Sequence, residues 1–298
     1  MVNLYTQSES NIRRTWIYLL FFGLVVIGIG WMISYLMDTY VILWISIFLA
    51  IFGNLFSYWF SDKIVLSMTK AKPVGKEDEP ELYRVVENLS ITAGLPMPKL
   101  YIMEEAQPNA FATGRNPSNG VIVVTRGLIN RLERIELEGV IAHELSHIGN
   151  RDILLSTIVV VLVGIVVTLT DFFFRTAFYG ERKDEEGGGK ILLIVFALAL
   201  AIFAPLAAQL MQMAISRKRE YLADSSGGLL TRYPEGLARA LEKISTDSTP
   251  MGKANNATAH LFIASPFRGK EKTSWLTKLF STHPPIEDRI AKLRGLSV

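Results

Sequence analysis

Four long apolar segments constrain the fold of this 298-residue chain more than any other feature. They cover residues 16–37, 41–60, 153–170 and 191–215, and none of them contains a charged side chain. A helix needs about 20 apolar residues to cross the hydrocarbon core of a bilayer. The first two segments meet that length, the third lies at its lower limit, and the fourth exceeds it but carries glutamines near its C-terminal end. The sequence therefore predicts a membrane protein with four spans, and a buried hairpin inside a soluble domain is the alternative for the last two.

The basic residues predict the orientation of the first two spans. Arg13 and Arg14 precede the first span, Lys63 and Lys70 follow the second, and the linker 38–40 has no basic residue. Because cytoplasmic loops carry an excess of lysine and arginine, both flanks are expected in the cytoplasm. The first segment is too long for the apolar core of a cleavable signal peptide, so it is expected to remain as an anchor.

The most informative chemical motif is His143-Glu144-Leu145-Ser146-His147, an H-E-x-x-H sequence. Positions i and i+4 share one face of a helix, so both imidazoles can bind the same metal ion. Two histidines, a third protein ligand and an open position form a hydrolytic zinc site in which the glutamate is the general base. The motif also occurs by chance on charged helices, but here two of only four histidines form the pair. The spacing therefore predicts one Zn²⁺ per chain, with Glu144 as the catalytic base.

The third metal ligand is expected directly after the fourth apolar segment. Glu220 and Asp224 are four residues apart there and share a helix face. A carboxylate from a separate helix is a usual third ligand, which makes Glu220 the candidate. Asp224 would accept a hydrogen bond from the free ring nitrogen of a liganding histidine and so fix its tautomer. A solvated, charged helix end beside the bilayer is the alternative interpretation of these carboxylates.

Composition excludes several other functions. The chain contains no cysteine, which excludes disulfides, cysteine metal sites and a cysteine nucleophile. Its net charge is only +3 and its basic residues form no block, so a nucleic-acid partner is not expected.

The region between the second and third apolar segments predicts a small α+β unit. An amphipathic helix is expected over residues 81–93, and strands are expected over 99–103 and 121–125. A further edge strand is expected from Asn109 to Thr113, bounded by Pro108 and by a Gly-Arg-Asn-Pro turn, with Asn109, Ala110, Phe111 and Ala112 as candidate substrate-binding residues. Such an edge could bind a substrate as an added strand, although an ordinary hairpin is an equal alternative. His283, before two prolines, is a candidate to stabilise the developing oxyanion or to support the metal ligands, and a purely structural role is the alternative.

Five motifs together resemble those of the HtpX-type membrane metalloproteases, which are relatives of the CaaX prenyl endoproteases. These are His143–His147, Gly149-Asn150-Arg151-Asp152, Arg219-Glu220-Tyr221-Leu222-Ala223-Asp224, Pro108–Gly114 and Thr282-His283-Pro284-Pro285. The resemblance extends over nearly the whole chain. It implies a zinc endopeptidase of the bacterial or archaeal plasma membrane that acts on misfolded proteins, in contact with membrane lipid, with its catalytic domain in the cytoplasm.

The expected fold is a mostly α membrane protein, with a four-helix transmembrane part and a cytoplasmic zincin-like α+β catalytic domain that holds a small β-sheet. Transmembrane hairpins are expected at 1–62 and 153–215, and the two parts of the catalytic domain at 63–152 and 216–298. Two other functions remain open at this point. One is a CaaX-type endoprotease that trims prenylated tails, and the other is a membrane scaffold that binds metal without cleaving.

Overall fold

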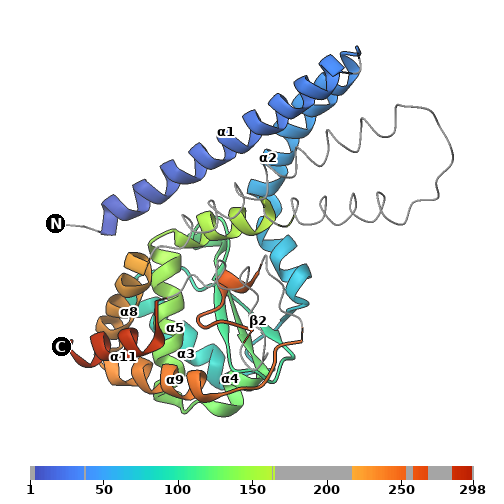
Figure 1. Cartoon of the computed structure of the whole chain (residues 1–298). Helices are drawn as coiled ribbons and strands as arrows, with labels where there is room; N and C mark the ends of the chain where they lie inside the picture. The colour runs from blue at the N-terminus through green and yellow to red at the C-terminus, as the bar shows by residue number, and fades with distance from the viewer. Residues whose placement is uncertain are drawn as a thin grey trace.

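The computed structural model describes residues 4–36, 38–162, 164, 217–252, 258–267 and 284–296. A pair of long helices, α1 (Leu4–Leu36) and α2 (Val41–Thr69), extends from a body built of shorter helices and one sheet (Figure 1). Both helices contain stretches long and apolar enough to cross a membrane. The side chains that α2 exposes are largely apolar and aromatic, as expected for a helix that faces lipid: Trp44, Phe48, Leu49, Phe52, Phe56 and Trp59.

The predicted third span begins as a buried helix. A sharp bend of 83° separates α5 (Arg134–Gly149) from a helix over Asp152–Leu162. The apolar side chains of this second helix are buried: Ile153, Leu154, Leu155, Ile158, Val159, Val160, Val161 and Leu162. Residues 165–170 and the whole of 191–215 lie outside the described residues, so four spans remain a prediction.

The sheet has four strands in the order β1-β2-β4-β3. Their bounds are Lys72–Pro73, Lys99–Met103, Ala110–Thr113 and Val121–Thr125 for β1 to β4. The central pair, β2 and β4, is parallel, whereas β1 and β3 pair antiparallel at the two edges. The strands predicted at 99–103 and 121–125 are therefore confirmed, and the predicted edge strand is β3.

Neighbouring side chains of a strand point to opposite faces of the sheet. Both faces of this sheet are apolar, and each is covered by helices. On one face, Ile122 and Val124 pack in a core with residues of α3 (Pro80–Ala93), α5 and α9 (Pro234–Thr246). On the other face, Val121 and Val123 pack with the end of α2 and with Val160. The C-terminal end of α2 thus lies in the core of the body.

The remaining described helices complete the face that carries α5. They are α4 (Arg126–Arg131), α8 (Arg217–Thr231) and α11 (Ile286–Arg294), with short 3₁₀ turns at Pro117–Asn119 and Ala259–Leu261. The predicted helix over 81–93 is confirmed as α3, and it ends at Gly94, whose φ of 64° lies in the left-handed region that glycine favours. Figure 1 shows α5 between α8 and the sheet, which places the H-E-x-x-H motif in the centre of the body.

Candidate metal centre

The two histidines of the motif lie on one face of α5 and point their Nε2 atoms to the same place. These atoms are 3.2 Å apart. The helix begins with a reciprocal capping box between Glu133 and Glu136, which fixes its first turn. His143 is fully buried and His147 is partly buried, so the pair lies in the body and not on its surface.

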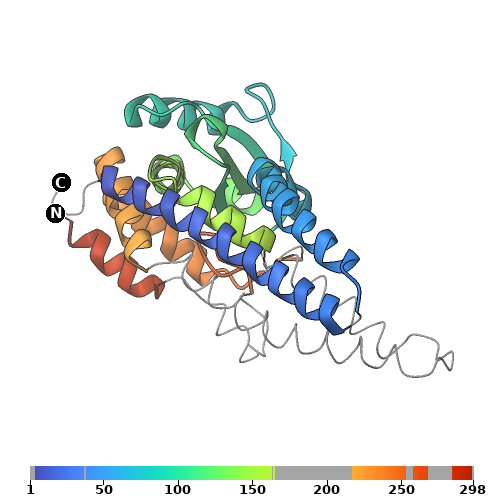
Figure 2. The same ribbon diagram turned by 90° about the horizontal axis from the view of Figure 1, so that it is seen from above.

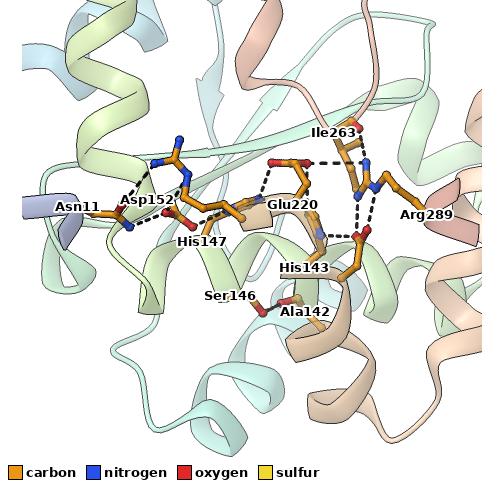
Figure 3. A network of polar contacts seen from close by, with 11 residues as sticks. Asn11, Ala142, His143, Ser146, His147, Asp152, Glu220, Ile263 and Arg289 are labelled. Atoms are coloured by element: carbon orange, nitrogen blue, oxygen red, sulfur yellow. Dashed lines mark hydrogen bonds and ion pairs between the residues drawn. The ribbon is translucent and has the colours of Figure 1, made fainter. Parts of the chain in front are cut away.

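Glu220 reaches the same place from α8. Its carboxylate oxygens lie 3.9 Å from His143 Nε2 and 3.5 Å from His147 Nε2 (Figure 3). One ligand atom from each of His143, His147 and Glu220 falls within 4.8 Å of the others, a spacing that fits a single metal ion. Gly227 permits this approach of α8 to α5, because a Cβ there would lie only 3.0 Å from the backbone nitrogen of His143.

The second ring nitrogen of His143 faces Asp224, as expected for a histidine that binds a metal through Nε2. His143 Nδ1 lies 2.9 Å from Asp224 Oδ1. Arg289, on α11, donates to both oxygens of Asp224 at 2.7 and 2.8 Å and also to the carbonyl of Ile263. Burial opposes ionisation of Asp224, but the Arg289 guanidinium outweighs it and holds the pKa of that carboxyl at about 2. Asp224 is therefore a fixed anion behind His143.

His147 has an equivalent partner that lies beyond the bend. Its Nδ1 is 3.1 Å from Asp152 Oδ2, and Arg219 Nε lies 3.5 Å from the other oxygen of Asp152. Each histidine is thus backed by one aspartate, and each aspartate by one arginine. Burial lowers the pKa of His147, but the carboxylates of Asp152 and Glu220 outweigh it and raise that pKa to about 9, so the site strongly favours a positive charge.

Glu144 lies beside the cluster with its carboxylate buried. Burial is the main cause that raises its pKa to about 7, and the nearby Glu220 acts in the same direction, whereas His147 and a hydrogen bond from the backbone of Ala112 oppose the rise. A carboxyl group with a pKa near neutrality can accept and return a proton at little cost, which is what a general acid–base catalyst needs.

The charges of the cluster fit a divalent cation. Four buried carboxylates surround the two histidines, on Glu144, Asp152, Glu220 and Asp224. Among the described residues, two buried guanidinium groups, on Arg219 and Arg289, face them. With both imidazoles neutral, as metal ligands must be, two negative charges are left when all four carboxylates are ionised. Buried charge that is not paired is costly. A doubly charged ion held by nitrogen and oxygen donors would neutralise the cluster.

The edge strand lies next to this cluster, but part of its outer edge is already paired. The amide of Ile263 donates to the carbonyl of Ala110, and Asn109 exchanges hydrogen bonds with Ala264. Phe111 is fully buried against Phe262. The outer edge of β3 is therefore already occupied at Asn109 and Ala110. A substrate strand could pair only with the C-terminal part of β3, where the backbone of Ala112 faces Glu144.

Among the other predicted site residues, His283 lies outside the described residues. Sequence reasoning assigned no role to Asp152, Arg219, Arg289 or Asn11, which the structure places around the histidines. Asp152 had a signal, since a helix that ends at Gly149-Asn150 can turn the next carboxylate back toward His147. Arg219 directly precedes Glu220 within one of the quoted motifs, whereas Arg289 and Asn11 come from distant segments and carry no local signal.

The chain is similar to known proteins over most of its length. The sequence pattern of peptidase family M48 matches residues 76–297, which include the whole cluster from α5 onward. The chain belongs to peptidase family M48. Its members are peptidases, so the scaffold interpretation is not needed.

Relatives within the family are HtpX proteases. The chain is 45% identical to a "Protease HtpX homolog" of Dictyoglomus thermophilum over 97% of this chain and 94% of the relative. It is 46% identical to that of Pyrococcus furiosus over 96% of both chains, and 43% identical to that of Thermoanaerobacter pseudethanolicus over 99% and 98%. The crystal structure of S. mikatae Ste24p matches with 20% identity and a TM-score of 0.49, over 94% of this chain and 66% of that one.

This M48 peptidase is therefore an HtpX-type metalloprotease with two apolar helices that mark it as a membrane protein. The resemblance seen in the sequence motifs is confirmed. The three candidate ligands are the ones that the motifs predicted, and the described residues contain no other cluster of this kind.

Proposed function

We propose that the metal is zinc, held by His143, His147 and Glu220, and that Glu144 is the general base of a zinc endopeptidase. The convergence of these three side chains within 4.8 Å, inside a cluster short of two positive charges, carries this proposal. Two histidines and one carboxylate with a position left open are a usual ligand set of hydrolytic zinc.

Zinc held there would lower the pKa of water to about 7 and polarise the peptide carbonyl. The residues of the chain supply the rest of the mechanism. Glu144 takes the proton of the attacking water and passes it to the leaving amine, and its pKa near 7 suits both steps. Asp224 and Asp152 hold the two imidazoles with Nε2 toward the metal and Nδ1 toward a carboxylate.

Substrates are proposed to bind as an extended strand beside the C-terminal part of β3, at the level of Ala112. Pairing through main-chain hydrogen bonds tolerates many sequences. This tolerance suits unfolded or misfolded proteins, including membrane proteins, as substrates in protein quality control. The close approach of Ala112 to Glu144 would bring such a strand directly past the metal.

The proposed location is the plasma membrane of a bacterium or archaeon, with four spans and the catalytic domain in the cytoplasm. The basic residues that flank the first two spans support this orientation. Reporter fusions at residue 39 and at the C-terminus should report opposite sides of the membrane, and reporters on the same side would contradict it.

Metal analysis of ligand variants tests the proposed site. The full-length chain would be purified in detergent with a chelator, reloaded with zinc and assayed for bound zinc and for cleavage of an unfolded protein. His143→Ala, His147→Ala and Glu220→Ala should lose both zinc and cleavage, whereas Glu138→Ala, which removes a partly exposed carboxylate on α5, should keep both. Zinc retained at one equivalent in Glu220→Ala would overturn the ligand assignment. His283→Ala should keep zinc and lose turnover if His283 contacts the oxyanion.

A further inference from the structure

Asn11 is a buried polar side chain near the start of the first apolar helix, and only 2% of it is exposed. Its amide nitrogen donates to Asp152 Oδ1 at 2.6 Å and to the carbonyl of Asn150 at 3.1 Å. Its amide oxygen accepts from the guanidinium of Arg219 at 3.3 Å. Both N–H donors and the carbonyl acceptor of this amide therefore form hydrogen bonds within one buried network.

All three partners of Asn11 support the metal site. Asp152 faces His147, Asn150 ends α5 directly after the motif, and Arg219 precedes the ligand Glu220. Figure 3 shows Asn11 entering this network from α1, on the side of Asp152 away from His147. A buried amide with its full complement of hydrogen bonds fixes the groups that it contacts. The network thus joins the membrane anchor to both helices that supply ligands.

The anchor is held in this position by apolar packing. Leu19 of α1 forms a buried cluster with Leu154, Ile158 and Leu162 of the helix that follows the bend. Seen from above, α1 runs along this helix (Figure 2). Asn11 lies two helical turns before Leu19, so the same helix face that packs on Leu154 delivers the amide to Asp152.

We infer that Asn11 is a positioning residue for the metal site and that the site is completed only when the first apolar helix is docked. The inference rests on the proposed metal ligands. Without the amide, Asp152 loses its 2.6 Å donor and can turn from His147 toward Arg219, which lies 3.5 Å away. The orientation of the His147 ring, and with it the affinity for zinc, would then be less well fixed.

Zinc affinity of Asn11→Leu tests this, because leucine has a similar volume but no hydrogen-bonding group. Full-length protein in detergent would be titrated with zinc against a chromophoric chelator. Removal of an outer-shell partner of a ligand costs about 10–100-fold in affinity, and we expect roughly tenfold for Asn11→Leu. The visible spectrum of the cobalt-substituted protein should change as well. Asn54→Leu is the matched control, since Asn54 is an amide in the same helical hairpin that, within the described part of the chain, donates to the Leu19 carbonyl and to no group of the metal site.

A double-mutant cycle separates positioning from general loosening of the anchor. If Asn11 acts through Asp152, Asn11→Leu should cost nothing further in an Asp152→Asn background. Additive losses, an unchanged affinity, or an equal loss in Asn54→Leu would overturn the inference. If Asn11→Leu does not fold, Asn11→Ser would replace it, and wild-type affinity in that variant would also overturn it. A wild-type chain that binds no zinc would instead overturn the proposed metal site itself.

Discussion

His147 and Asp152 lie on opposite sides of a break between two helices, and the break brings His147 Nδ1 to 3.1 Å from Asp152 Oδ2. On an uninterrupted helix, residues five positions apart point in different directions. Here α5 ends at Gly149, Arg151 adopts a φ of 56°, and the next helix leaves at 83°. The bend that redirects the chain thus also supplies the second partner of a metal ligand.

Substitution at Arg151 should test the backbone strain in this break. The left-handed conformation costs a residue with a side chain roughly 1–2 kcal/mol, and glycine adopts it freely. We expect Arg151→Gly to raise the free energy of unfolding by about 0.5–1 kcal/mol, and Arg151→Val, which is β-branched, to lower it. Denaturant titrations of the metal-free proteins in detergent would measure both, and a stable Arg151→Val would contradict the strained turn.

Arg289 should be far more important for stability than Arg294, although both are on α11. Arg289 is fully buried and binds both oxygens of Asp224, so Arg289→Met leaves that buried carboxylate without its cationic partner. Breaking one partner of a buried pair costs about 3–5 kcal/mol. Arg294 pairs with Glu235 and Glu242 at the exposed surface, where solvent screens the interaction, so Arg294→Met should change stability little. If Arg289→Met and Arg294→Met lowered the midpoint of thermal unfolding by the same amount, this prediction would be wrong.

Gly227→Ala should weaken both the fold and metal binding. The added Cβ would meet the backbone of Ala142 and His143 at 3.0–3.2 Å, so α8 must move away from α5 and carry Glu220 with it. Overpacking of this kind costs about 1–3 kcal/mol. Gly228→Ala is the control, because its Cβ meets the ring of Pro234 and no part of the metal site. Zinc affinity should fall only in Gly227→Ala, and a loss in Gly228→Ala alone would contradict the packing argument.

Methylation of substrate backbone nitrogens should reveal strand pairing at β3. In an added strand, only alternate residues pair with the edge. Peptide substrates methylated at successive nitrogens around the cleavage site should therefore lose cleavage at every second position, by roughly tenfold for each hydrogen bond removed. The ratio kcat/KM of each methylated peptide, relative to that of the unmethylated peptide, shows which positions are sensitive. Sensitivity with no period of two would exclude strand addition.

Local patterns explain what could be predicted from the sequence. Helix α3 and strands β2 and β4 are found within a residue or two of their predicted bounds, because amphipathic period, β-branched runs and a terminal glycine act over neighbouring residues. The H-E-x-x-H pair is equally local, since its spacing alone places both imidazoles on one helix face.

The supports of the metal site depend on contacts that no local pattern encodes. Arg289 meets Asp224 from 65 residues away, and Asn11 meets Asp152 from 141 residues away. Pairing of the outer edge of β3 with Ile263 was missed for the same reason: the partner segment lies far along the chain and has no strand pattern of its own. The sequence could not decide whether the third apolar segment begins inside the protein or in lipid, because burial in either requires the same apolar composition.

Zinc content and cleavage measured together in the wild type and in Glu144→Gln decide whether Glu144 is the base of a zinc hydrolase. Both proteins would be purified under chelation, reloaded with zinc, and mixed with an unfolded protein substrate. We expect one zinc per chain in both proteins, cleavage by the wild type, and a rate lower by about 10²–10⁴-fold in Glu144→Gln, the range typical of general acid–base catalysis. Equal cleavage by the two zinc-loaded proteins would contradict the assignment of Glu144 and the hydrolytic mechanism built on it.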